Sequence, residues 1–213
     1  MIGRRQFLGA GLAMIISGDV FAATPASDLS TKVFAIIDAM DVESKWPAGV
    51  HVDWLTGIPD GKPIKTEGKH THCSAFVAAA AKALGIYVLR PPEHSAKLLA
   101  NAQNEWLLTD GASQGCVQLK DMTEAQDKAN EGYLVLAAYH NHKDDKPGHI
   151  AIIRPGNKDA AALAAEGPDV TQAGGTNFRV ATLVRGFAGH PKAWANQEIL
   201  YFAHAVDEVK LGG

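Results

Sequence analysis

The stretch Lys69–Ile86, "KHTHCSAFVAAAAKALGI", decides how the rest of the chain is interpreted. It predicts a helix that begins at Cys73, because the apolar residues after it recur with helical spacing and Gly85 can end the helix. Unpaired N–H groups at a helix N-terminus stabilise a thiolate. Cys73 is therefore a nucleophile, half of a disulfide with Cys116, or a small core residue.

The first 22 residues predict an export signal rather than part of the fold. Two arginines in "RRQFL" (4–8) are followed by a glycine-rich apolar run that closes on "VFA" (20–22), a suitable cleavage site. The twin arginines resemble a twin-arginine export signal. We therefore expect residues 23–213 to form a single domain that is periplasmic or secreted. No stable membrane insertion is expected once the signal is removed.

The composition is that of an ordinary globular domain. The chain has 213 residues, of which 46% are hydrophobic and 20% charged, with a formal net charge of −3. The basic surplus that marks nucleic-acid binding is missing, so we expect no nucleic-acid partner. The chain contains two cysteines, and in an exported protein they could pair.

The periodicity of apolar residues predicts helices followed by strands. The helices are expected at residues 28–40, 73–84, 93–107 and 123–130, and residues 44–70 form a long loop. The strands are expected at residues 132–140, 148–155, 169–174, 179–187 and 198–204. This order predicts an α+β domain with N-terminal helices packed on a central antiparallel sheet of about five strands.

Two polar residues in the predicted strands are candidate partners for Cys73. His149 opens the strand at 148–155, where a rigidly held imidazole could act as a general base. Gln172, in the following strand, could hydrogen-bond the far ring nitrogen and fix its tautomer. Either residue alone is also compatible with a position on an exposed strand, and the order of the three residues carries the prediction.

At this point the chain resembles the NlpC and CHAP groups, papain-like cysteine peptidases and amidases of bacterial cell walls. "HCSAFVAAA" (72–80) is similar to the start of their cysteine-bearing helix. "EGYLVLAAYHN" and "PGHIAIIRPG" (within 131–156) resemble their strand pair around the histidine, and "VTQAG" (170–174) falls where they place a third polar residue. The resemblance covers roughly residues 46–187.

The resemblance implies Cys73 as nucleophile, His149 as base and acid, and Gln172 as orienter. It also implies hydrolysis of an amide in peptidoglycan stem peptides through an acyl-thioester, with no metal or organic cofactor. Two departures exist: His72 stands where the NlpC group commonly has Asp, and residues 132–134 lack the family's usual Asp.

Four further residues are candidates for binding the substrate. Trp54 could line a sugar or peptide groove, and His72 and Ser74 flank the nucleophile. Asn177 follows Gln172 closely and could face the same cleft, although a turn asparagine is commoner.

Three alternatives remain open from the sequence. The pairs His70/His72 and His140/His142 could bind zinc, because residues i and i+2 of a strand share a face. The thioester could pass to an amine or hydroxyl, which would make the protein an acyltransferase. Finally, the protein could be a non-catalytic envelope-binding or structural protein with a Cys73–Cys116 disulfide.

Overall fold

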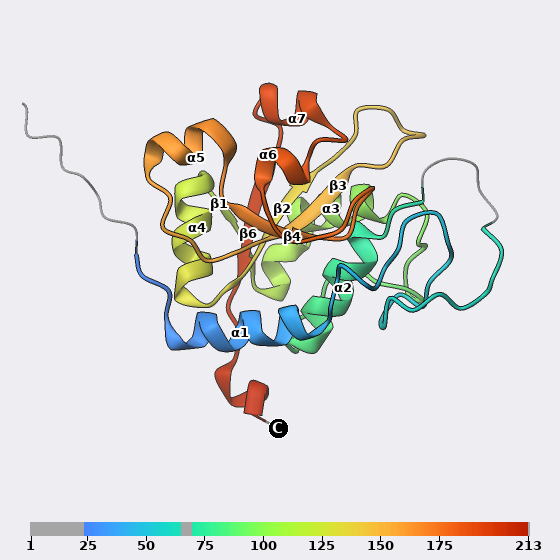
Figure 1. Cartoon of the computed structure of the whole chain (residues 1–213), viewed down its shortest axis with the longest axis horizontal. Helices are drawn as coiled ribbons and strands as arrows, with labels where there is room; N and C mark the ends of the chain where they lie inside the picture. The colour runs from blue at the N-terminus through green and yellow to red at the C-terminus, as the bar shows by residue number, and fades with distance from the viewer. Residues whose placement is uncertain (1–23, 65–69, 213) are drawn as a thin grey trace, which may run out of the picture.

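The computed structural model describes residues 24–64 and 70–212, so the predicted export signal at residues 1–22 lies outside the described residues. The described part contains seven α-helices and one open antiparallel sheet of six strands (Figure 1). This confirms the predicted α+β class and its antiparallel sheet. Among the described residues, no helix has the length and apolar character needed to cross a membrane.

The helices and strands alternate more than the sequence predicted. The helices are α1 (Asp28–Ala39), α2 (Cys73–Ala83), α3 (Leu99–Thr109), α4 (Met122–Glu131), α5 (Ala160–Glu166), α6 (Leu183–Gly186) and α7 (Pro191–Ala195). The strands are β1 (Cys116–Leu119), β2 (Leu134–Tyr139), β3 (His149–Ile153), β4 (Asp169–Gln172), β5 (Phe178–Thr182) and β6 (Leu200–His204). Their order across the sheet is β1-β6-β2-β3-β4-β5.

The observed elements differ from the predicted ones in one additional strand and in two boundaries, among others. Strand β1 was not predicted at all, and it raises the number of strands from about five to six. The predicted strand at 179–187 ends at Thr182, because the Thr182 side chain accepts the N–H of Arg185 and caps the short helix α6. The predicted helix at 93–107 begins only at Leu99, after Leu98 in a left-handed conformation.

Helices cover both faces of the sheet, and alternation along each strand assigns every side chain to one face. Helices α1, α2 and α3 contribute to one core cluster, which also contains Ile150 and Ile152 of β3. Helices α4, α6 and α7 contribute to the other, which contains Ala151 and Ile153. Figure 1 shows α1 and α2 below the sheet and α6 and α7 above it. We call these the α2 face and the α6 face.

Helix α2 can pack close to the sheet because many of its buried side chains are small. The run Ala78–Ala81 is buried, and small side chains let the helix backbone approach the strands. The helix ends as predicted, because Gly85 adopts a positive φ of 72° and its N–H bonds the carbonyl of Lys82.

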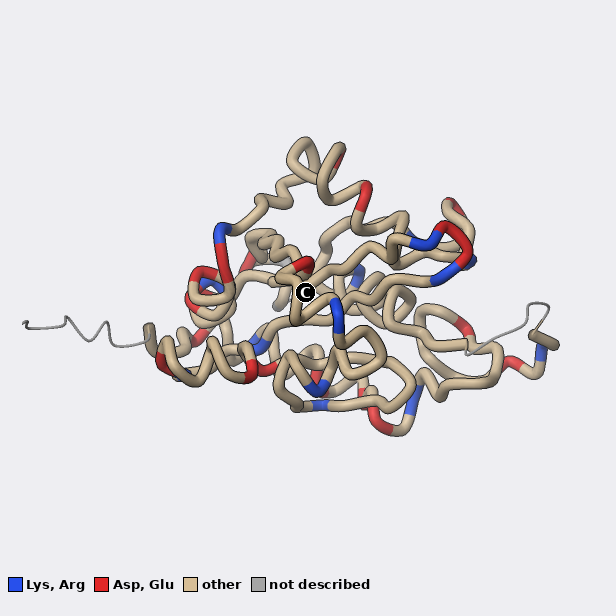
Figure 2. Tube along the Cα trace, turned by 90° about the horizontal axis from the view of Figure 1, so that it is seen from above, with Lys and Arg blue, Asp and Glu red and all other residues tan. Residues whose placement is uncertain are grey.

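Charged residues of both signs are interspersed along the chain (Figure 2).

Candidate active site

Cys73 is the first residue of α2, as the sequence predicted. Its side chain is only 4% exposed and belongs to the core cluster of the α2 face. Burial raises the pKa of the Cys73 thiol, because the thiolate loses its solvation. The N–H groups of Ile150 and Ser74 and the hydroxyl of Thr71 oppose this shift by donating toward the sulfur. The sulfur therefore lies beside the backbone of β3, among donors that favour an anion.

His149 and Gln172 form the side-chain pair that the sequence predicted. The His149 Nε2–H donates to the Gln172 Oε1, and both side chains are buried. The amide of Gln172 is itself oriented, because its Nε2 donates to the carbonyl of Thr176 at 3.2 Å. This arrangement places the ring proton on Nε2 and leaves Nδ1 as the basic nitrogen.

The structure does not bring the His149 ring to the sulfur of Cys73. Ile150 lies on the α2 face with Cys73, so its neighbour His149 points to the α6 face. The contacts of His149 agree, since its ring lies 4.7 Å from that of Phe187, a residue of the α6-face core. In this arrangement the ring of His149 cannot take the thiol proton directly.

A second histidine packs against His149 on the α6 face. The rings of His149 and His190 are stacked with centroids 5.9 Å apart and planes 24° from parallel. Burial lowers the pKa of His149 to about 4, and the hydrogen bond to Gln172 opposes this shift. Burial and the neighbouring His149 lower the pKa of His190 to about 4. Both rings are therefore neutral near pH 7.

A cleft of about 930 Å³ opens at the N-terminus of α2. Its lining comes from the loop at 50–64, from residues 70–75 around the start of α2, from the segment at 91–99, and from Asp145 and Pro147. Thr71, His72 and Ser74 line it, whereas the Cys73 between them is buried. The nucleophile predicted from the sequence thus lies just behind the wall of this cleft.

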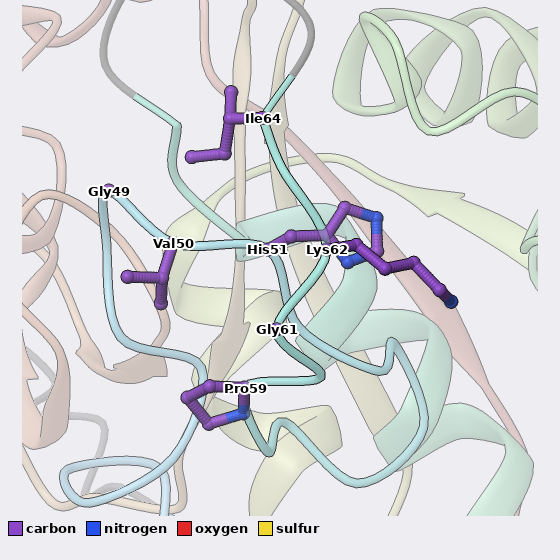
Figure 3. Close-up of a pocket in the computed structure, with 7 residues that line it drawn as sticks. All are labelled: Gly49, Val50, His51, Pro59, Gly61, Lys62 and Ile64. Atoms are coloured by element: carbon purple, nitrogen blue, oxygen red, sulfur yellow. The ribbon is translucent and has the colours of Figure 1, made fainter.

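A smaller hollow of about 370 Å³ adjoins this cleft and shares residues of the 50–64 loop with it. Figure 3 shows the side chains of His51 and Lys62 pointing to the same side of this hollow. Both pair with Asp60, at 2.7 Å from His51 Nδ1 and 2.9 Å from Lys62 Nζ. The hydrogen bond from Lys62 is the largest cause that lowers the pKa of Asp60 to about 2, so this carboxylate is ionised.

Three of the four predicted substrate-binding residues line the cleft: Trp54, His72 and Ser74. The ring of His72 is also engaged by backbone, because its Nε2 bonds the carbonyl of Val50 at 2.9 Å. Burial lowers the pKa of His72, and its hydrogen bonds to backbone carbonyls oppose this shift.

Asn177, the fourth predicted residue, does not line the cleft. Its Nδ2 donates to the carbonyls of Val42 and Lys45 at 2.8 Å and of Trp46 at 3.1 Å. Its Oδ1 accepts the N–H of Gly174 at 3.0 Å. Asn177 thus ties the segment at 42–46 to the sheet, and its polar atoms are used within the fold.

In the pair His140/His142 of the metal alternative, each ring contacts a different carboxylate. His140 Nε2 lies 2.9 Å from Glu105 and His142 Nε2 lies 3.0 Å from Glu198. Within residues 24–64 and 70–212, no three His, Cys, Asp or Glu side chains are grouped so as to hold a metal ion.

The two cysteines are free and buried. Cys116 lies in β1, whereas the sulfur of Cys73 lies beside β3, and three strand spacings separate these strands. At about 4.8 Å per spacing this is about 14 Å, too far for a disulfide, which needs Cα atoms within about 7 Å. Burial raises the pKa of Cys116 to about 11.

Asn101 is a residue of this region that the sequence did not single out. Its side chain is 6% exposed and bonds three backbone groups of the β2–β3 loop, including the N–H of Gly148 just before His149. A polar residue within a predicted amphipathic helix gives no signal of such a contact, because the partner lies 47 residues away in the sequence.

Comparison of the chain with protein-family models and with curated proteins gives no match.

Proposed function

We propose that the chain is a papain-like cysteine hydrolase of the NlpC and CHAP kind, exported to the periplasm or beyond, which cleaves an amide bond in peptidoglycan stem peptides. The observation that carries the proposal is the position of Cys73. It begins α2 at the wall of a peptide-sized cleft, with N–H groups of Ile150 and Ser74 directed at its sulfur. His149 directly precedes Ile150 in β3, and its partner Gln172 lies in the neighbouring strand β4.

The reaction follows from these parts. The sulfur of Cys73 attacks the amide carbonyl, its proton passes to a base, and an S–C bond forms as the C–N bond breaks. The protonated base returns the proton to the leaving amine. Water then attacks the thioester, which releases the carboxylate and restores the thiol. Backbone N–H groups near the sulfur are the donors available to the developing oxyanion.

This mechanism requires the His149 ring to reach the α2 face when substrate is bound. His149 is the first residue of β3, and the pairing of β3 with β4 begins only at Ile152. In the sheet ladder, the backbone of the strand end that carries His149 thus pairs with β2 alone, through the register Tyr139↔His149, and the hydrogen bond to Gln172 is the side-chain contact with β4 that must break. We propose that the backbone at this end of β3 rotates, so that the His149 side chain moves from the α6 face to the α2 face. A strand end that is paired on one side only can rotate at a lower free-energy cost than one paired on both sides.

The test is digestion of purified peptidoglycan, with the released fragments identified by mass spectrometry. We expect Cys73→Ala and His149→Ala to lose activity by about 10³-fold or more and Gln172→Ala by about 10- to 100-fold, since the three act as a unit. Cys116→Ala is the matched control and should keep full activity. Fragments released by Cys73→Ala protein would overturn the proposal. Products joined to an added amine would instead indicate an acyltransferase that uses the same thioester.

A second candidate is a non-catalytic envelope-binding protein. The observation that favours it is the separation of the thiol and the imidazole onto opposite faces of the sheet, together with the raised pKa of Cys73. Such a protein would sediment with peptidoglycan and release no fragments. The Cys73–Cys116 disulfide that the sequence allowed for such a protein is not formed.

A further inference from the structure

The charged side chains of the cleft are few, and most of them are already paired. Among residues 24–64 and 70–212, its lining contains two lysines, Lys62 and Lys97, and one carboxylate, that of Asp145. Lys62 is neutralised by Asp60 at 2.9 Å. Among the ion pairs of the described residues, none includes Lys97. Of the two lysines in the described lining, Lys97 is therefore the one whose ammonium a ligand can engage.

The position of Lys97 places its charge at one end of the cleft. It lies just before α3, and the Asn101 side chain one turn later bonds the carbonyl of Lys146 at 3.0 Å. The segment at 91–99 and the loop that carries Asp145 are thus held together at this end. Leu98 and Pro147 also line the cleft here, so apolar surface adjoins the exposed Lys97 in this part of the lining.

The chemistry of this end fits a carboxylate better than a phosphate. One unpaired ammonium matches one negative charge, and the nearby Asp145 repels a dianion. Asp145 is itself only weakly held, with Lys146 at 3.5 Å and both side chains exposed. Farther along, the hydroxyl residue Ser74 and the aromatic ring of Trp54 provide the hydrogen-bonding and apolar surface that a peptide needs.

We infer that the cleft binds the free carboxylate of a short peptide and that Lys97 is the residue that pairs with it. The inference rests on the proposed function for the peptide nature of the ligand. It goes beyond that function by naming a specificity residue and the group that this residue recognises.

The experiment is calorimetric titration of the full chain carrying Cys73→Ala, which binds without turnover. The probes are the tetrapeptide L-Ala-D-Glu-L-Lys-D-Ala, the same peptide with a C-terminal amide, and the same peptide with the free α-carboxylate of D-Glu converted to an amide. We expect one of the two amidations to weaken binding about tenfold or more, and Lys97→Gln to remove that difference. The matched control is Lys62→Gln, which should keep the full difference because Asp60 already neutralises this lysine.

Three results would overturn the inference: equal binding of all three peptides, a difference that persists in Lys97→Gln, or no binding of any peptide. Its failure is distinguishable from that of the proposed hydrolysis, because binding is measured without turnover. If the wild-type chain releases no fragments from peptidoglycan but Lys97 still discriminates the carboxylate, the hydrolase proposal fails and the inference stands.

Discussion

The Oδ1 atom of Asn101 accepts the backbone N–H of Gly148 at 2.7 Å, so helix α3 holds the residue that precedes His149. The same oxygen accepts the N–H of Asn141 at 3.2 Å, and Nδ2 donates to the carbonyl of Lys146 at 3.0 Å. One buried amide thus fixes both ends of the β2–β3 loop, and with them the entry of β3 and one end of the cleft.

Replacing the Asn101 side chain should lower the stability of the folded protein. We expect Asn101→Ala to lower the free energy of unfolding by about 2–4 kcal/mol. A buried polar group left without a partner costs about 1–3 kcal/mol, and more than one of the backbone groups that Asn101 bonds would lose its partner. Urea denaturation measures the change. Asn196→Ala is the control: its side chain is exposed and bonds only Glu198, so a change below about 0.5 kcal/mol is expected. Equal stability of the two variants would contradict the role assigned to Asn101.

Both thiols should be found free in the protein prepared without reductant. The separation of about 14 Å between the Cys73 sulfur and β1 prevents their pairing without large movement of the sheet. Denaturation in the presence of a thiol reagent should therefore label two cysteines per chain, and prior reduction should not increase this number. A linked peptide containing Cys73 and Cys116 would show that the described arrangement of α2 and β1 is wrong.

The sequence predicted most of the fold because the signals were local. The start and end of α2 follow from its apolar spacing and from Gly85, and α4 lies within one residue of its predicted range. Strand β1 escaped prediction because it is short, lies at the sheet edge and exposes Val117 and Gln118. Helix α6 escaped because its sequence "LVRG" continues the β-branched run of β5, and only the Thr182 cap marks the change.

The candidate site was predicted only in part, for a physical reason. Alternation places His149 and Gln172 on a common face, which the sequence could anticipate once both strands were assigned. It could not show which face α2 covers, because the residues at Ile150–Ile153 are fully buried on both sides. The face of Cys73 relative to His149 is set by tertiary packing, which the local pattern does not encode.

The buried rings of His149 and His190 should make the fold sensitive to acid. The pKa of His149 is about 4 in the folded chain and about 6.5 when unfolded, so the unfolded state binds more protons between these values. Stability is therefore fully present above pH 6.5 and falls as the pH drops toward 4, by about 3 kcal/mol from His149 alone. His190, less buried, adds to the change in the same direction.

Urea denaturation at pH 7.5, 6.5, 5.5 and 4.5 measures this slope. His149→Gln, which cannot titrate, should reduce the slope to the part that His190 contributes, while lowering stability at pH 7.5 through lost packing against Phe187. A slope unchanged by the substitution would mean that His149 is not buried as a neutral ring.

The last prediction concerns the reactivity of Cys73 in the free protein. Burial raises the pKa of its thiol, and the His149 ring lies across the sheet, so the sulfur is not primed before substrate binds. Iodoacetamide labelling of Cys73, followed by mass spectrometry from pH 5 to 9, should be slow below about pH 8.5 and should rise with pH. His149→Ala should leave the labelling rate unchanged.

The informative comparison is between the labelling rate of the free thiol and the rate at which peptidoglycan is hydrolysed. Under the proposed function, substrate brings the imidazole to the sulfur, so His149→Ala abolishes hydrolysis although it does not alter labelling of the free thiol. The matched control is His142→Ala, whose exposed ring pairs with Glu198 outside the cleft lining and which should keep both hydrolysis and labelling. Rapid labelling at pH 6 that disappears in His149→Ala would instead show that the dyad is already formed without substrate, with the first residue of β3 facing α2.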